Sequence, residues 1–265
     1  MLITSRDNNI IKDYIKLAQN KKYRYETKRF VIEGVRLVND AVLSGVNIET
    51  AFFLETAIEK NIELYTLLTQ KNVKVYTINA ILSDKMADTQ NTQGIFCIAF
   101  MLDKEIILDR IDVDGVYLSL ENIQEPGNLG TMLRTADAFG WSGVILSQGC
   151  ADIYSPKVVR AAMGAIFRIS FIVTQDLVNT IKALNLKGMN SVAAVVDASA
   201  NDILQTNFSG GIIVAIGNEG NGLTKEVIDA CKNNVTIRMK GHAESLNAAT
   251  AASVIMWEIS KKFKV

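Results

Sequence analysis

Three polar turns hold the residues of this 265-residue chain whose types and spacing could support chemistry. Each turn follows an apolar run, and the turns lie at 122–134 (with Asn122, Glu125, Asn128 and Arg134), 217–224 (GNEGNGLT) and 240–250 (KGHAESLNAAT). They offer many backbone N–H and C=O groups, small side chains and few charges. Such a set suits a neutral or zwitterionic ligand held by backbone hydrogen bonds, such as an adenine ring, better than a triphosphate.

Several classes of chemistry are excluded by what the sequence lacks. His242 is the single histidine, which limits acid–base catalysis by imidazole. Cys97, Cys150 and Cys231 lie far apart, which argues against a structural zinc site or a disulfide framework. The phosphate-binding patterns G-x-G-x-x-G and G-x-x-x-x-G-K-[ST] do not occur. Direct transfer from an activated donor remains open, because it needs neither a metal nor a histidine.

The elements that must position these turns alternate between strand-like and helix-like patterns. The predicted strands are 30–34, 48–54, 73–78, 95–100, 115–120, 143–147, 169–173, 191–196, 211–216 and 235–239. The predicted helices include 10–20, 35–45, one that begins at Ser155-Pro156 and a last one that ends near Lys261. This alternation predicts an α/β fold, with a parallel sheet covered on both faces in the second half. The charge-rich stretch 101–114 marks the predicted boundary between domains 1–104 and 105–265.

The overall composition indicates a soluble, reduced, cytoplasmic protein. Apolar residues make up 49% of the chain, and 28 basic side chains balance 28 acidic ones. The N-terminus is charged, and no run approaches the roughly 18 apolar residues that a membrane-spanning helix needs. A net charge of zero argues against a protein held on nucleic acid by bulk charge, although a local basic patch stays compatible with it.

One such patch is KKYRYETKR at 21–29, in which five basic residues alternate with two tyrosines. Two interpretations stay open. The segment is either a solvated, lysine-rich helix end, or a surface that contacts phosphates and stacks tyrosines on bases.

The three turns together resemble motifs of the SpoU, or TrmH-like, RNA 2′-O-ribose methyltransferases of the SPOUT superfamily. The matching residues are Asn122-x-x-Glu125-Pro126-x-Asn128-x-Gly130-x-x-x-Arg134, then Ile216-Gly217-Asn218-Glu219-Gly220-x-Gly222-Leu223, then Ile237-x-Met239-x-Gly241 with Ser245-Leu246-Asn247. The segment Ser5–Val42, especially FVIEGVRLV at 30–38, is similar to the family's N-terminal L30e-like substrate-binding domain. One departure is Arg238, where the family's third motif usually has proline.

The resemblance implies an L30e-like module followed by a parallel-sheet SPOUT domain with a deep trefoil knot. It also implies a homodimer, S-adenosyl-L-methionine as methyl donor without a metal, and transfer to a ribose 2′-hydroxyl. Ribosomal RNA is favoured as substrate over transfer RNA, because the N-terminal module is large. By the same resemblance, the catalytic residues are Arg134, Asn128, Glu219, Ser245 and Asn247. The cofactor-binding residues are Val195, Gly217, Ile237, Ser245 and Leu246. The expected RNA-binding residues are Lys21, Lys22, Arg24, Lys28 and Arg29.

Arg134 matches the family's catalytic arginine, which is often described as a base. Because arginine stays protonated in proteins, we expect it to stabilise the developing alkoxide and to grip an adjacent phosphate. Two alternatives from other classes are a catalytically silent RNA-binding protein of the same fold and a Rossmann-type oxidoreductase. The presence of the expected catalytic residues argues against the first, and the missing glycine fingerprint argues against the second.

Overall fold

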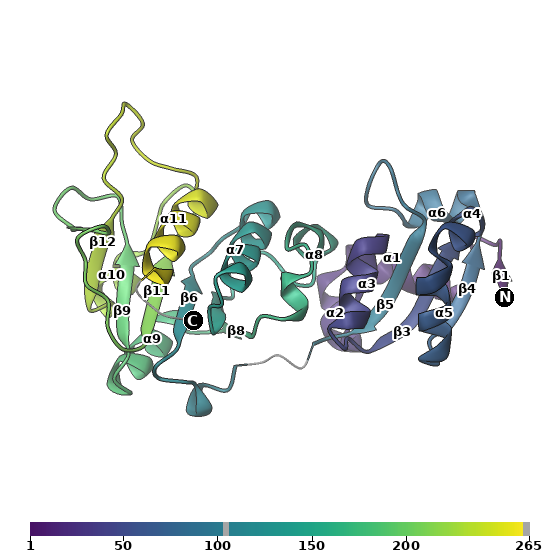
Figure 1. The fold of residues 1–265 in the computed structure, drawn as a ribbon, viewed down its shortest axis with the longest axis horizontal. Coiled ribbons are helices and arrows are strands. Elements are labelled where there is room, and N and C mark those ends of the chain that lie inside the picture. The colour runs from purple at the N-terminus through teal and green to yellow at the C-terminus, as the bar shows by residue number, and fades with distance from the viewer. Residues whose placement is uncertain (103–105, 262–265) are drawn as a thin grey trace. The chain divides into compact units, whose positions relative to one another are not determined.

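The computed structural model describes residues 1–102 and 106–261, which form two compact units (Figure 1). One unit comprises Met1–Asp103 and Asp152–Phe167, and the other comprises Lys104–Ala151 and Arg168–Val265. The domain boundary predicted between residues 104 and 105 lies outside the described residues, so that division stays a prediction. No described helix is both long and apolar enough to cross a bilayer.

The first unit is built on a five-stranded mixed sheet in the order β1-β4-β3-β5-β2. The strands are β1 (Leu2–Ile3), β2 (Arg29–Glu33), β3 (Ile48–Leu54), β4 (Lys74–Ile78) and β5 (Ile95–Phe100). Strands β1, β4 and β3 run parallel, whereas β5 is antiparallel to both β3 and β2. The helical elements before residue 102 are α1 (Asn9–Gln19), α2 (Lys21–Thr27), α3 (Val35–Leu43), α4 (Glu55–Ile58), η1 (Glu59–Asn61), α5 (Ile62–Gln70) and α6 (Ala80–Met86).

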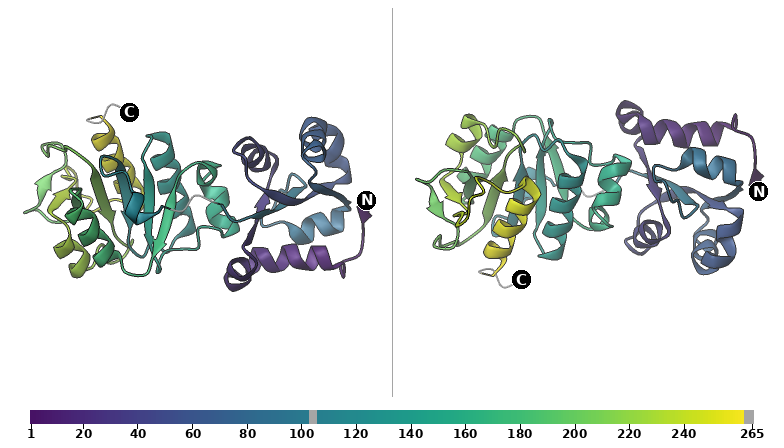
Figure 2. Two further views of the ribbon diagram at one scale, coloured as in Figure 1. Left: turned by 90° about the horizontal axis from the view of Figure 1, so that it is seen from below. Right: turned by 90° about the horizontal axis from the view of Figure 1, so that it is seen from above.

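Helices cover both faces of this sheet, as the two views in Figure 2 show. On one face, α1 and α6 bury apolar side chains against the strands. Tyr14 of α1 is 1% exposed and makes edge-to-face contacts with Phe52 and Phe96. Asparagine side chains cap the starts of helices in this unit. The Asn8 side chain, directly before α1, accepts a hydrogen bond from the Ile10 backbone N–H.

The segment Asp152–Phe167 belongs to the first unit, although the strands before and after it belong to the second. It carries α8 (Pro156–Ala161) and η3 (Ala165–Phe167). Ser155 caps α8 and accepts from the Val158 N–H, which confirms the helix start predicted from Ser155-Pro156. Tyr154 packs on Phe30 of β2 with a ring separation of 5.0 Å. The sequence pattern did not predict this assignment to the first unit.

The second unit has a seven-stranded sheet in the order β10-β12-β9-β11-β6-β7-β8. Every recorded pairing in it is parallel, as the alternating pattern predicted. The strands are β6 (Val116–Leu120), β7 (Gly143–Ser147), β8 (Phe171–Thr174), β9 (Asn190–Ala194), β10 (Asn201–Asp202), β11 (Ile212–Ile216) and β12 (Asn233–Thr236). The helical elements are η2 (Leu108–Arg110), α7 (Pro126–Ala138), α9 (Leu177–Leu186), α10 (Lys225–Ala230) and α11 (Ala248–Ser260).

The strand order gathers the three polar turns at one end of this sheet. The turns follow β6, β11 and β12, and in parallel strands the carboxyl ends meet at the same edge. Strand β12, the last along the chain, lies between the earlier strands β9 and β10. Helices α7 and α11 pack together through a 3.2 Å hydrogen bond between the Thr135 and Ser253 hydroxyls.

Candidate active site

A cavity of about 570 Å³ opens at the carboxyl ends of β9, β11 and β12. Its walls are the segments that follow these three strands and the first turns of α11. All five residues predicted to bind the cofactor line it: Val195, Gly217, Ile237, Ser245 and Leu246. The second and third sequence motifs therefore converge on one hollow in the second unit.

The loop after β11 is closed by its own backbone. The Asn218 N–H donates to the Gly222 carbonyl at 3.0 Å, and the Gly222 N–H donates back to the Asn218 carbonyl at 2.9 Å. A Cβ atom at Gly217 would lie 2.1 Å from the Gly222 carbonyl carbon and from the Leu223 nitrogen. Glycine is therefore required at position 217, because the loop folds back onto this backbone.

A chain of polar side chains joins the three turns beside the cavity. The Asn247 amide donates to the Asn128 side-chain carbonyl at 3.1 Å. The Asn128 amide in turn donates to the Glu219 carboxylate at 2.9 Å. Asn247 also caps α11, since its side-chain oxygen accepts from the Ala249 N–H. Three of the five residues predicted to be catalytic are thus held in contact with one another.

The Glu219 carboxylate is ionised by its surroundings. Partial burial raises its pKa, but donors outweigh that effect and leave the pKa below its ordinary value of 4.5. The donors are the Asn128 amide and the backbone N–H groups of Glu125 and Gln124. Glu219 consequently acts as a fixed anion that receives hydrogen bonds, and it orients Asn128.

The cavity lining combines apolar walls with negative charge. Asp197, Glu219 and Glu244 line it, and among residues 1–102 and 106–261 no lysine or arginine does. Ile237 and Leu246 are among the apolar side chains of the wall, and Gly217 exposes backbone. This lining fits a ligand that carries a flat aromatic ring and a net positive charge, as a sulfonium amino-acid nucleoside does. A polyphosphate would meet the three carboxylates and no cation in this lining.

Arg134 and Ser245 have different places relative to this polar chain. Ser245 lines the cavity, whereas Arg134 does not. Arg134 lies on α7, six residues after Asn128, which is about 9 Å along a helix axis. Its side chain is exposed, and among residues 1–102 and 106–261 no hydrogen bond or ion pair to it is found. The guanidinium is therefore available to an incoming anionic group.

One positioning residue was missed by the sequence reasoning. Glu121, directly after β6, is 7% exposed, and its carboxylate accepts from the Thr224 N–H and hydroxyl, both at 2.8 Å. Thr224 caps α10, so this carboxylate ties the end of β6 to the loop after β11. The available signal was a charged residue directly after a mostly apolar, strand-like run, because a charge buried at the end of such a strand needs hydrogen-bonding partners.

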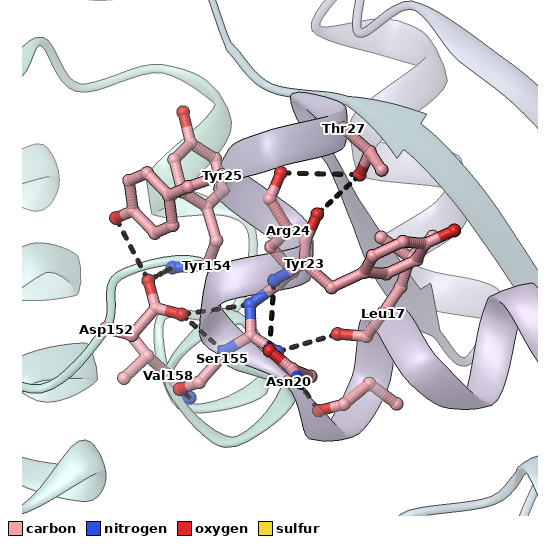
Figure 3. Close-up of polar contacts among 11 residues, drawn as sticks. Leu17, Asn20, Tyr23, Arg24, Tyr25, Thr27, Asp152, Tyr154, Ser155 and Val158 are labelled. Atoms are coloured by element: carbon pink, nitrogen blue, oxygen red, sulfur yellow. Dashed lines mark hydrogen bonds and ion pairs between the residues drawn. The ribbon is translucent and has the colours of Figure 1, made fainter.

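The basic segment 21–29 forms helix α2 in the first unit, and its central arginine faces inward. Figure 3 shows the Arg24 guanidinium bound to Asp152 and to the Leu17 carbonyl. The Arg24 and Asp152 side chains are 4% and 7% exposed, and the Arg24 Nε–Asp152 Oδ2 distance is 2.9 Å. The prediction of Arg24 as a phosphate contact does not fit this geometry, because its donors are already used inside the unit.

Arg29 and the two tyrosines of this segment are also engaged within the unit. Arg29 pairs with Asp13 at 2.8 Å and with Glu49 at 2.9 Å. The Tyr23 hydroxyl donates to Asp13, and Lys16 covers its ring at 3.9 Å. The Tyr25 hydroxyl donates to Asp152 (Figure 3). Burial is the main cause that raises the Tyr25 pKa far above its ordinary value.

The remaining predicted RNA contacts are exposed lysines. Lys21, Lys22 and Lys28 are all exposed, and Lys22 makes a loose 3.7 Å ion pair with Glu26. Lys28 ends α2 with a left-handed backbone, at φ 54°. The segment therefore has an inner face with a structural role, which neither interpretation predicted, and an exposed face that carries three lysines. Contact of these lysines with RNA stays a prediction.

Sequence comparison identifies the family. The chain matches the SpoU rRNA Methylase family over residues 115–257 and an MRM3-like substrate binding domain over residues 8–97. The chain belongs to the SpoU rRNA methylase family. The family predicted from the three motifs is thereby confirmed, as is the RNA methyltransferase class of activity. A relative in Bacillus subtilis, the 23S rRNA (guanosine(2553)-2′-O)-methyltransferase RlmP, is 31% identical over 97% of this chain and 98% of its own length.

Solved structures of the same type superpose on nearly the whole chain. The AdoMet-bound rRNA methyltransferase from Sinorhizobium meliloti has a TM-score of 0.86 and 30% identity, and it covers 100% of this chain and 99% of its own. The SpoU methyltransferase AviRb from Streptomyces viridochromogenes, in complex with AdoMet, has a TM-score of 0.81 and 25% identity. That match covers 96% of this chain and 98% of the AviRb chain.

Proposed function

We propose that this SpoU family member transfers a methyl group from S-adenosyl-L-methionine to a ribose 2′-hydroxyl of ribosomal RNA. The observation that carries the proposal is the acidic, glycine-bounded cavity flanked by the chain Asn247–Asn128–Glu219. The Bacillus subtilis relative methylates a 2′-oxygen of 23S rRNA by its name, and two structural neighbours hold AdoMet. Both findings support this substrate and this donor.

The residues around the cavity fit the donor. When bound, S-adenosyl-L-methionine supplies a methyl group already activated by a positive sulfonium. Gly217, Ile237 and Leu246 would hold its nucleoside through backbone groups and apolar contact, with Val195 and Ser245 in the adjoining wall. The carboxylates of the lining would balance its positive charge. No group of three or more metal-ligating side chains lies among residues 1–102 and 106–261.

Two side chains beside the cavity, Asn128 and Arg134, would act on the RNA substrate. Both polar ends of the Asn128 side chain are engaged, one by Glu219 and one by Asn247, so its orientation toward a bound ribose would be fixed. Arg134 would stabilise negative charge that develops on the 2′-oxygen and would contact an adjacent phosphate. It would act as a permanent cation, because a guanidinium does not release its proton at neutral pH.

Two features of the family complete the proposal. The second unit would carry a deep trefoil knot, and the position of β12 between two earlier strands supports it. Two copies would form a homodimer, with the active sites at the interface. The exposed Trp257 and Val254 of α11 support an interface on this helix, at 53% and 38% exposure. We further propose a cytoplasmic location and RNA contacts through Lys21, Lys22 and Lys28.

The deciding experiment maps ribose methylation of total RNA in cells that lack the gene. Loss of one 2′-O-methyl site in ribosomal RNA is expected, with restoration by the wild-type gene and not by an Arg134→Ala variant. Loss of a site in transfer RNA instead would reassign the substrate. No lost site, together with normal donor binding by the purified protein, would favour a silent RNA-binding protein of the same fold.

The role of Arg134 is tested with a lysine variant. Arg134→Lys keeps the charge and loses the planar fork, so we expect a large loss of turnover with an unchanged pH profile. Near-wild-type turnover with a shifted pH profile would contradict the electrostatic role.

A further inference from the structure

Arg238 occupies a distinct place beside the cavity. It follows β12 by two residues, between Ile237 and Met239, which both line the cavity. The Arg238 side chain is exposed, whereas its two neighbours are half-buried. This alternation is that of an extended segment, and it directs the guanidinium away from the side on which its neighbours line the cavity.

The Arg238 guanidinium holds the loop 195–200. Its Nη1 donates to the Ala198 carbonyl at 2.7 Å, and its Nη2 donates to the Ala200 carbonyl at 3.1 Å. The planar fork of arginine can serve two carbonyls at once, which a single ammonium group cannot do in the same geometry. Both hydrogen bonds come from a charged donor and are stronger than neutral ones.

This loop forms a wall of the cavity, and at its start the Val195 N–H donates to the Val235 carbonyl at 2.9 Å. Ala194, the last residue of β9 before the loop, pairs with Val235 of β12. Asn201, the first residue of β10 after the loop, pairs with the same Val235 from the opposite edge of β12. Val195 and Asp197 of the loop line the cavity. Within the loop, the Asp197 carboxylate accepts from the Ser199 N–H and hydroxyl at 2.7 and 2.8 Å, which shapes the turn.

The charge of Arg238 also acts on the loop. The Ser199 hydrogen bonds are the main cause that lowers the Asp197 pKa, and the nearby Arg238 adds to this effect. Asp197 is one of the three carboxylates that make the cavity acidic. The proline that the family's third motif usually has at this position carries no side-chain donor, so the contact belongs to this chain's own sequence.

We propose that Arg238 is a positioning residue for the methyl donor, which fixes the loop 195–200 as the wall of the donor cavity. The inference rests on the proposed function, since it takes the cavity to be the donor site. Without the two hydrogen bonds, the loop samples more conformations, and donor binding has to order it again at the cost of affinity. Once donor is saturating, turnover is little affected, because Arg238 does not touch the reacting atoms.

The test compares Arg238→Ala, Arg238→Lys and the control Lys240→Ala, an exposed cation two residues along the same segment. Titration calorimetry with S-adenosylhomocysteine gives the affinity, and hydrogen exchange of the ligand-free proteins gives the order of residues 195–200. We expect Kd to rise about tenfold in Arg238→Ala and about threefold in Arg238→Lys, with Lys240→Ala within about twofold of wild type. Hydrogen exchange of residues 195–200 is expected to be fastest in Arg238→Ala, slower in Arg238→Lys and closest to the wild-type rate in Lys240→Ala.

The outcomes separate this inference from the proposed function. If the wild-type protein binds S-adenosylhomocysteine and Arg238→Ala binds it equally well with unchanged exchange, the inference is overturned and the proposed function stands. If Arg238→Ala lowers kcat at saturating S-adenosyl-L-methionine and leaves the KM for S-adenosyl-L-methionine unchanged, the positioning role is overturned as well. If the wild-type protein does not bind S-adenosylhomocysteine, the proposed function fails and this inference fails with it.

Discussion

Replacing Gly217 with alanine is expected to deform the donor cavity from within its own wall. The added Cβ would lie 2.1 Å from the Gly222 carbonyl carbon and the Leu223 nitrogen, about 1.3 Å short of the 3.4 Å at which ordinary contact begins. No side-chain rotation relieves this clash, because both opposing atoms belong to the backbone. The Gly222 end of the loop must move away, and the paired hydrogen bonds between Asn218 and Gly222 cannot survive such a shift.

The magnitude follows from these two hydrogen bonds. Each hydrogen bond contributes a net free energy of roughly 0.5–1.5 kcal/mol, so losing both costs about 1–3 kcal/mol. If this cost falls on binding of the methyl donor, it corresponds to about 5- to 150-fold weaker affinity. Titration calorimetry of Gly217→Ala with S-adenosylhomocysteine measures this change directly. Circular dichroism melting curves report whether the rest of the unit stays folded.

A matched glycine control is Gly241→Ala. A Cβ at Gly241 would meet nothing within 4 Å, and this glycine does not line the cavity. We expect its affinity to stay within about twofold of wild type. If Gly217→Ala binds S-adenosylhomocysteine as tightly as wild type, the folded-back loop is not what shapes the donor site and the reasoning is refuted.

Three further changes test other parts of the molecule. The pKa of Glu219 in the folded protein is lowered from its ordinary value of 4.5, so the ionised carboxylate stabilises the fold above pH 4.5. This stabilisation is lost as the pH falls through the lowered pKa of the folded state. The melting-temperature advantage of wild type over Glu219→Gln should therefore disappear well below pH 4.5, and a constant difference would contradict this. Arg24→Ala leaves Asp152 buried without its partner, so urea unfolding should show a loss of about 3–5 kcal/mol, partly recovered in the double variant with Asp152→Ala. A loss under about 1 kcal/mol would show that Asp152 finds other donors. Trp257→Glu places a charge on the exposed face of α11 and should convert the proposed dimer to a monomer in sedimentation velocity, unless the interface lies elsewhere.

Buried strands were the most predictable part of the fold. The predicted strands 48–54, 95–100 and 143–147 coincide with β3, β5 and β7, because each contains a short run of buried apolar residues, which is typical of a strand inside a sheet. The last strand was predicted at 235–239, and this was wrong at both ends, since β12 spans Asn233–Thr236. Ile237 and Met239 are apolar because they line the cavity, and a strand pattern cannot separate that cause from sheet burial.

The candidate site was predictable where short-range spacing defines it. The loop at Gly217 and the cap at Asn247 are local features, and both lie where the motifs indicated. Arg24 was assigned wrongly because its partner Asp152 is 128 residues away, and a basic helix has the same sequence pattern whether a cation faces inward or outward. The two-residue strands β1 and β10 were missed, since two residues carry no periodicity.

The place of Asp152–Phe167 in the first unit has a consequence for how the chain folds as it is made. Residues up to 102 emerge from the ribosome first, but they leave Phe30 without Tyr154 and Arg24 without Asp152 until the later segment has been synthesised. The N-terminal unit therefore cannot complete its core vectorially, ahead of the rest. It must wait for more than 60 further residues, including β6, α7 and β7, to leave the exit tunnel. A fragment that stops at residue 102 is accordingly expected to be an incomplete folding unit, and the two halves mature together.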